Sequence, residues 1–226
     1  LVDSLLSVRY ALYSEYIPNT DLVNYIQESG GTYLYENLYT LPLGFVLPYD
    51  LADNWQYQME NPAEVQNDLC LLLGTDDVLV PVETEVSGSG CTFTADMAGE
   101  YYVYIQNKKV KNVKASLPSG EKNFSNVDRG YLLEMGNLSE GSRITLTPGE
   151  SGETLTAAVY RFSPRAMIQV YDRLSQSPLH LDSWRDTKLT GTVTAAESGT
   201  LFLSIPYDEG WTITIDGQPA EGEKIL

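Results

Sequence analysis

From Val78 onwards the chain consists of short stretches in which apolar and polar residues alternate, separated by turn residues about every 8–12 positions. The turns contain Gly or Pro, as in Ser87-Gly88-Ser89-Gly90 and Pro148-Gly149. A period of two places one side of each strand in a core, so many such strands predict an antiparallel β-sandwich. The predicted strands are Val82–Val86, Cys91–Ala95, Tyr101–Ile105, Lys111–Ala115, Tyr131–Met135, Ile144–Leu146, Leu155–Phe162, Lys188–Ala195, Gly199–Ile205 and Trp211–Ile215.

Two stretches instead have the period of an amphipathic helix. The first covers residues 62–73, where Asn61 stands at the N-cap position and Pro62 at the first helical position. The second covers residues 164–175 and follows Ser163, which is also a favourable N-cap residue. Because predicted strands lie on both sides of the second helix, we expect it to be a crossover between sheets.

The first 60 residues have a mixed pattern. Thr20 can cap a short helix over Thr20–Glu28, and Gly30-Gly31 can end it. Strands are predicted over Val8–Tyr13, Tyr33–Tyr35 and Leu43–Leu47.

These elements together predict an α+β, mainly β fold. We expect a jelly-roll-like antiparallel β-sandwich over residues 77–226, with its crossover helix at 164–175, and a mixed α/β segment over residues 1–76 that packs on it. The 16 tyrosines agree with a β-rich chain.

The net charge of −17 limits the possible partners. Nucleic acid and anionic lipid are both bound through clustered Lys and Arg, and so neither is expected. The acidic residues favour a well-solvated surface, with binding of divalent cations or cationic ligands as the alternative. No apolar run approaches the roughly 18 residues of a membrane span, and Leu1 is not followed by a basic signal-peptide region. The chain is therefore expected to be cytosolic or a segment of a longer protein.

The two cysteines, Cys70 and Cys91, permit one disulfide. Their positions, in a predicted helix and at a strand start, favour two buried free thiols over a bridge.

Catalytic chemistry has little support in the sequence. His180 is the only histidine, which disfavours a Ser-His-Asp system or a zinc site built on histidines. Asp76-Asp77 and Asp216-Gly217 do not have the spacing of a calcium-binding EF-hand loop. The many acidic residues allow a carboxylate pair for glycoside hydrolysis, but nothing selects one. We therefore expect no catalytic residue, metal ligand or cofactor in this chain.

Aromatic residues offer a better-supported binding chemistry, because an aromatic face can stack on the C–H groups of a sugar. Trp184, Tyr207, Asp208 and Trp211 are the predicted sugar contacts, and the last three lie within five residues of one another. The alternative, which the alternation of Trp211 with Ile213 and Ile215 favours, places Trp211 in the core. Other aromatic candidates are Trp55, Tyr102 and Tyr104. We also expect a positive φ angle at Gly210.

Two groups of residues carry a resemblance to a known family. Ser204-Ile205-Pro206-Tyr207, then Gly210-Trp211, runs into the apolar strand that ends at Asp216-Gly217. Nearer the start, Val8-Arg9-Tyr10, Tyr35-Glu36-Asn37 and Leu41-Pro42-Leu43-Gly44-Phe45 follow in order, and Asn61-Pro62 with Gln66-Asn67 continues the series. In this order they resemble the YfhO family of bacterial multi-pass membrane proteins.

The resemblance implies a function that the residues alone do not. Members look like GT-C-type glycosyltransferases that take sugar from a polyprenyl-phosphate carrier and are linked to lipoteichoic acid glycosylation. Their catalytic acid lies in a loop between membrane helices, which this chain lacks. The chain is thus expected to be a non-catalytic accessory domain on the extracytoplasmic face of the plasma membrane. Its expected partners are a cell-wall polymer or glycan and the protein's own transmembrane helices.

Two alternatives remain open: a free-standing carbohydrate-binding sandwich, and a structural domain without a ligand. One departure from the family is that its members continue past the Asp-Gly strand with another hairpin, whereas this sequence stops at Ile225-Leu226. The departure suggests a trimmed chain or a missing edge strand.

Overall fold

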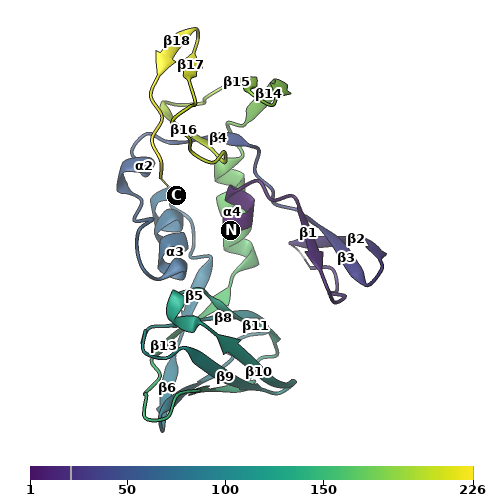
Figure 1. Cartoon of the computed structure of the whole chain (residues 1–226), viewed down its shortest axis with the longest axis vertical. Coiled ribbons are helices and arrows are strands. Elements are labelled where there is room, and N and C mark those ends of the chain that lie inside the picture. Colours follow the sequence, from purple (N-terminus) through teal and green to yellow (C-terminus); the bar gives the residue numbers. More distant parts are fainter. Residues whose placement is uncertain (21, 226) are drawn as a thin grey trace. The chain divides into compact units, whose positions relative to one another are not determined.

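The computed structural model describes residues 1–20 and 22–225. Cα packing groups the chain into two compact units, and Figure 1 labels their elements. The jelly-roll unit consists of Gln58–Leu71 and Asp76–Ala166. The discontinuous unit consists of Leu1–Tyr57, Leu72–Thr75 and Met167–Leu226. The division expected from the sequence, into residues 1–76 and 77–226, differs from the boundaries of these two units and stays a prediction.

The jelly-roll unit holds two antiparallel sheets, in the orders β10-β9-β12-β7-β6 and β11-β8-β13-β5. The chain crosses from one sheet to the other after β5, β7, β8, β10, β11 and β12. This alternation gives the strand order of a jelly roll, with β6 as an additional edge strand. The mainly β fold and the jelly-roll-like sandwich are thereby confirmed. The strands are β5 Leu79–Val82, β6 Thr84–Ser87, β7 Gly90–Thr94, β8 Gly99–Ile105, β9 Asn112–Leu117, β10 Gly120–Ser125, β11 Leu133–Leu138, β12 Arg143–Pro148 and β13 Ala157–Phe162.

The core of this unit lies between the two sheets, as the alternating pattern predicts. In β9, Val113, Ala115 and Leu117 are buried while the residues between them are exposed. Phe93 of β7 stacks against Tyr101 of β8, with ring centroids 5.9 Å apart. The predicted strand Val82–Val86 is in fact two strands in different sheets, and Pro81 lies in β5, an edge strand, where a missing N–H is tolerated.

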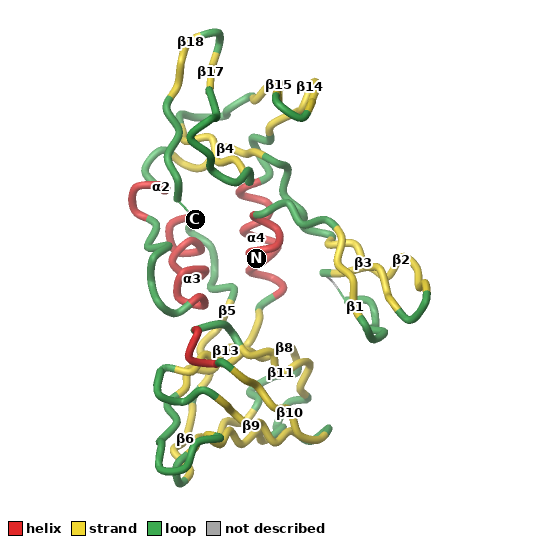
Figure 2. Tube along the Cα trace, viewed as in Figure 1, coloured by secondary structure: helices red, strands yellow, loops and turns green. Residues whose placement is uncertain are grey.

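Both predicted helices are present, and Figure 2 shows them among strands and loops. Helix α3 covers Pro62–Leu73, and Asn61 accepts a hydrogen bond from the amide of Ala63 at 3.0 Å. Helix α4 covers Pro164–Leu174, and the Ser163 hydroxyl accepts one from the Ala166 amide at 3.3 Å. The shorter helices are α1 Val2–Leu5, α2 Leu51–Asn54 and the 3-10 helix η1 Val127–Arg129.

The discontinuous unit contains a three-stranded sheet, in the order β1-β3-β2, and three two-stranded sheets, β4-β16, β14-β15 and β17-β18. The strands that follow α4 therefore pair outside the two sandwich sheets. The strands are β1 Tyr10–Tyr13, β2 Val23–Ser29, β3 Thr32–Asn37, β4 Gly44–Pro48, β14 Leu179–Arg185, β15 Lys188–Val193, β16 Gly199–Leu203, β17 Ile213–Ile215 and β18 Gln218–Ala220.

The predicted helix over Thr20–Glu28 is wrong, because Val23–Ser29 forms strand β2. The Thr20 hydroxyl does accept hydrogen bonds from the amides of Leu22 and Val23, but this local cap closes a turn before a strand. Gly30 and Gly31 both have positive φ, at 60° and 79°. Such a pair fits the two-residue turn of a hairpin, here between β2 and β3.

Cys70 and Cys91 are both buried and are not joined in a disulfide, as predicted. None of the helices in the described part of the chain is long and apolar enough to cross a membrane.

Candidate functional site

Trp184 lies on β14, in the hairpin that β14 forms with β15. Its side chain is 74% exposed. A bulge between Leu181 and Ser183 shifts the register of the hairpin just before Trp184. The hydroxyls of Ser183 and Thr190 form a hydrogen bond of 2.7 Å across the two strands. Trp184 pairs with Leu189 on the opposite face of the hairpin from these two hydroxyls, so it presents an accessible ring that suits stacking on a sugar.

Tyr207, Asp208 and Trp211 lie together in the loop between β16 and β17. Tyr207 is 55% exposed and Trp211 is 42% exposed. The Asp208 side chain accepts a hydrogen bond from the Gly210 amide at 2.7 Å, and its carbonyl accepts one from the Trp211 amide at 3.1 Å. These bonds fix the turn that places the two aromatic residues near one carboxylate.

The structure corrects two expectations about this loop. Trp211 is not a core residue, because its side chain is exposed in the loop before β17. Gly210 does not have a positive φ; the positive angles fall at Asp216 and Gly217, at 51° and 77°. Asp216-Gly217 forms the two-residue turn between Ile215 and Gln218, so it closes the β17 strand as expected.

Trp184 lies on β14, whereas Tyr207, Asp208 and Trp211 lie in the loop before β17. In the described part of the chain, no ring contact joins Trp184 to Tyr207 or Trp211. The other aromatic candidates are less accessible, since Trp55 and Tyr104 are buried and Tyr102 is half-buried. The groups of Trp184 and of Tyr207, Asp208 and Trp211 therefore remain the aromatic candidates.

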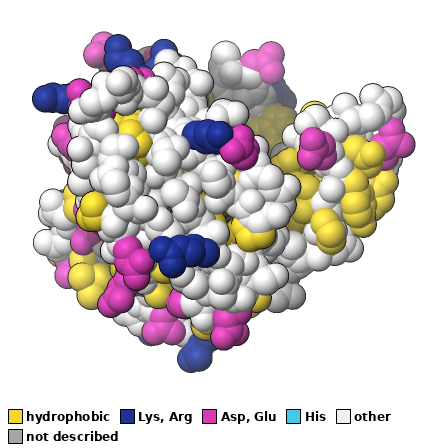
Figure 3. Space-filling model, turned by 90° about the horizontal axis from the view of Figure 1, so that it is seen from below, with side chains coloured by type: hydrophobic (Ala, Val, Ile, Leu, Met, Phe, Trp, Pro, Cys, Tyr) yellow, Lys and Arg dark blue, Asp and Glu magenta, His cyan; other side chains and the backbone are white. Residues whose placement is uncertain are grey.

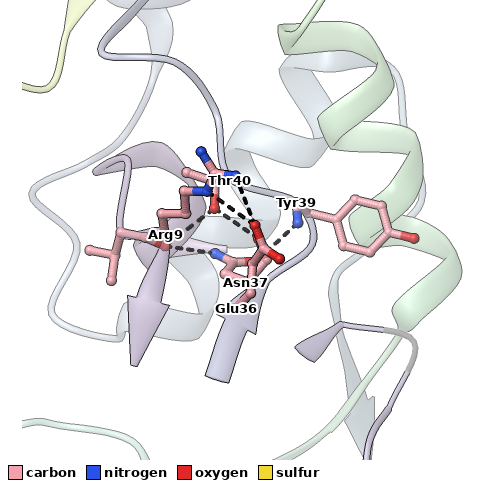
Figure 4. Close-up of polar contacts among 6 residues, drawn as sticks. Arg9, Glu36, Asn37, Tyr39 and Thr40 are labelled. Atoms are coloured by element: carbon pink, nitrogen blue, oxygen red, sulfur yellow. Dashed lines mark hydrogen bonds and ion pairs between the residues drawn. The ribbon is translucent and has the colours of Figure 1, made fainter. Parts of the chain in front are cut away.

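The N-terminal motifs meet at the base of the three-stranded sheet. Tyr10 pairs with Glu36 across β1 and β3. Arg9 donates hydrogen bonds from Nε and Nη2 to Glu36 Oε1, at 3.1 and 2.9 Å (Figure 4). Asn37 donates to the Val8 carbonyl at 3.1 Å and accepts from the Tyr39 amide at 3.0 Å. Val8-Arg9-Tyr10 and Tyr35-Glu36-Asn37 therefore join two strands, which is an architectural role.

The sequence did not suggest a polar hollow of about 350 Å³ in the jelly-roll unit. Its lining includes Glu60 just before α3, Glu64 in the first turn of α3 and Tyr104 near the end of β8. The hydroxyl of Tyr104 accepts a hydrogen bond from Lys108 at 2.7 Å. Carboxylates beside a polar aromatic group can bind hydroxyls. The hollow could not be predicted from the sequence, because it forms where the start of α3 lies beside the end of β8, and only the tertiary structure brings these two segments together.

Among the residues described, no group of three or more His, Cys, Asp or Glu side chains is placed to hold a metal ion. The perturbed carboxylates instead lie at structural positions. Burial raises the pKa of Glu100 on β8, the hydrogen bond from Tyr102 opposes this, and the charge of Glu134 adds to it.

Fold and site together define a β-rich protein that has a jelly-roll unit and exposed aromatic residues on hairpins and loops. A family model described as bacterial membrane protein YfhO matches residues 75–226, more than half of the chain. The chain belongs to the YfhO family of bacterial membrane proteins, as the motif around Pro206 and Trp211 indicated. The motifs before residue 75 lie outside the matched range. Neither a curated protein nor a solved structure shows significant similarity.

Proposed function

We propose that this chain is a non-catalytic extracytoplasmic domain of a glycosyltransferase-like membrane protein. Its role is to orient a cell-wall polymer of the lipoteichoic acid type as the sugar acceptor. The single observation behind the proposal is the exposure of Trp184, Tyr207 and Trp211 in a chain of a membrane protein family. Tryptophan and tyrosine are enriched at binding surfaces, because their rings offer an apolar face and a polar group at the same time.

The chemistry of these residues suits a neutral sugar unit. The faces of Trp184 and Trp211 can stack on C–H groups, and the Asp208 carboxylate can accept hydrogen bonds from hydroxyls. The net charge of −17 disfavours the phosphate groups of a teichoic backbone. The proposal therefore assigns recognition to the sugar units of the acceptor and not to its phosphates.

Titration of the chain with wall-polymer fragments, followed by NMR shifts and tryptophan fluorescence, tests the proposal. We expect saturable shifts with a dissociation constant of about the mM range. Trp184→Ala and Trp211→Ala should each weaken binding without lowering the melting temperature, because both rings are exposed. Tyr49→Ala is the matched control, since Tyr49 is also an exposed aromatic residue. Unmoved spectra would make the domain a scaffold.

A second assay addresses catalysis. The purified chain is incubated with a polyprenyl-phosphate sugar and acceptor, and no transfer above background is expected. Turnover would contradict the non-catalytic role. The alternative of a free-standing carbohydrate-binding module predicts the same binding, but it requires a complete reading frame without membrane spans around this segment.

A further inference from the structure

The three-stranded sheet β1-β3-β2 has a closed face made of tyrosines. Tyr35 is fully buried, and the rings of Tyr13 and Tyr25 meet it edge-on at 5.3 and 5.6 Å. Tyr16, from the loop after β1, covers this face through edge contacts with Tyr25 and Tyr33. The small sheet therefore builds its core on this side from its own loop.

The opposite face of the sheet carries an aliphatic row. Leu12 of β1 pairs with Leu34 of β3. On β2, the register shifts between Tyr25 and Gln27, so Ile26 and Gln27 both oppose Leu34. Leu12, Leu34 and Ile26 thus form a row across all three strands, here called the aliphatic row. Leu12 is 70% exposed and Ile26 is 43% exposed. Figure 3 shows hydrophobic side chains gathered on the lobe at the right of the view, where this sheet lies.

The charges around the aliphatic row narrow the choice of partner. Residues 10–35 contain three acidic residues and no Lys or Arg, so a polyanion finds no cation there. A second copy of the chain would also carry a charge of −17, and like charges oppose self-association. Arg9, just before β1, forms an ion pair with Glu36 at 2.9 Å. An uncharged apolar surface is the complementary partner.

The lipid bilayer has such a surface below its headgroups, and the members of this family are bacterial membrane proteins. Tyrosine is enriched at the boundary between headgroups and acyl chains, because its ring is apolar and its hydroxyl is polar. Tyr10 flanks the aliphatic row on the same face of the sheet, two residues from Leu12. Leucine and isoleucine on an exposed face of a small sheet can insert at shallow depth beside it.

We propose that the aliphatic row of the β1-β3-β2 sheet inserts into the interface of the lipid bilayer. The contact is apolar and not electrostatic, so it does not depend on anionic lipid. Glu15 and Glu28, near the turns of the sheet, disfavour anionic headgroups. Binding should therefore weaken as the anionic lipid fraction rises, which is the reverse of what a basic patch gives. The proposal rests on the family and on this sheet, and it is independent of glycan recognition.

Vesicle co-sedimentation of the whole chain tests the proposal. Wild type should partition onto phosphatidylcholine vesicles, and less onto vesicles with a large fraction of phosphatidylglycerol. Leu12→Ser with Ile26→Ser should lower the partition coefficient by about tenfold or more. Because both side chains are exposed, this double variant should fold normally. The matched control is Leu71→Ser with Val86→Ser, two exposed apolar residues outside the sheet, which should bind like wild type.

Three outcomes would overturn the proposal. Absence of vesicle binding would leave the aliphatic row to a protein partner, such as membrane-spanning helices. Equal loss of binding in both double variants would show that the row is not specific. Sedimentation equilibrium that finds a dimer of wild type but a monomer of the Leu12→Ser, Ile26→Ser variant would make the row a contact between copies. As a direct measure of depth, Leu12→Trp should gain fluorescence that brominated lipid quenches.

Discussion

The hydroxyl of Tyr35 donates a hydrogen bond to the carbonyl oxygen of Ile17 and accepts one from the Ile17 amide, each at 2.7 Å. One buried side chain on β3 thereby satisfies both backbone groups of a residue in the loop after β1. This loop is the one that closes the tyrosine face of the sheet.

Tyr35→Phe keeps the ring but removes both hydrogen bonds, and we expect a loss of about 1–3 kcal/mol because the Ile17 groups lose a buried partner. Urea unfolding together with hydrogen exchange of the β1-β3-β2 amides measures the effect. Tyr33→Phe is the control, since no hydrogen bond of the Tyr33 hydroxyl occurs among the residues described. Equal stability of the two variants would contradict the role assigned to Tyr35.

A second prediction concerns Gly90, at the start of β7. A Cβ on this residue would lie 2.0 Å from the Leu146 carbonyl oxygen on β12, so the two strands could not keep their distance. Gly90→Ala should destabilise the jelly-roll unit by about 1–3 kcal/mol or more. Thermal unfolding checks this, with the neighbouring Ser89→Ala as control. A Gly90→Ala protein that melts like wild type would show that the sheet adjusts freely.

The pH dependence of stability should have opposite signs at two carboxylates. The first, Glu100, has a folded-state pKa above its ordinary 4.5, mainly through burial. Its stability contribution is full below 4.5 and is lost as pH rises through the folded-state pKa. Glu100→Gln should therefore melt higher than wild type at pH 7, and the gain should shrink at acid pH. Melting curves of both proteins between pH 3 and 7 test this prediction. A Glu100→Gln variant that is less stable than wild type at pH 7 would contradict it.

The second carboxylate, Asp96, behaves in the other direction. Burial alone would raise its pKa, but hydrogen bonds from Tyr101, at 2.6 Å, and from Arg161, at 3.1 Å, outweigh this and lower it below its ordinary 3.8. Its contribution is present above pH 3.8 and is lost as pH falls through the folded-state pKa. Asp96→Asn should be less stable than wild type at pH 7 and similar to it near pH 2. A deficit that persists in acid would rule out the charge as the cause.

The buried thiols give a fifth prediction. Burial raises the pKa of Cys91 to about 11, so almost no thiolate exists at neutral pH. Aromatic disulfide reagents should therefore modify neither Cys91 nor the buried Cys70 in the folded chain at pH 7.5, whereas both should react after unfolding in urea. Rapid modification of the folded protein would contradict the burial of these side chains.

Local patterns predicted the elements whose signals are themselves local. Helix α3 was predictable because Asn61 and Pro62 define its start, and β9 because every second residue is buried. The β2 strand was missed because a Thr20 cap suits a helix start and a turn equally well. For Trp211 the sequence left two possibilities, an exposed sugar contact or a core residue. Alternation marks which side chains share a face, but tertiary packing decides whether that face is covered, and Trp211 is exposed.

Leu79 at the start of β5 pairs with Phe162 at the end of β13, and this bears on how the jelly roll could be exchanged in evolution. These two residues mark where the chain enters and leaves the jelly roll, and they face each other across adjacent strands. A module whose ends meet can be gained, lost or exchanged by its host while the host chain is rejoined over a short gap. The strands from Leu79 to Phe162 form such a module, without the helix α3 that packs in the same unit. Relatives in which these strands are replaced or absent are therefore to be expected.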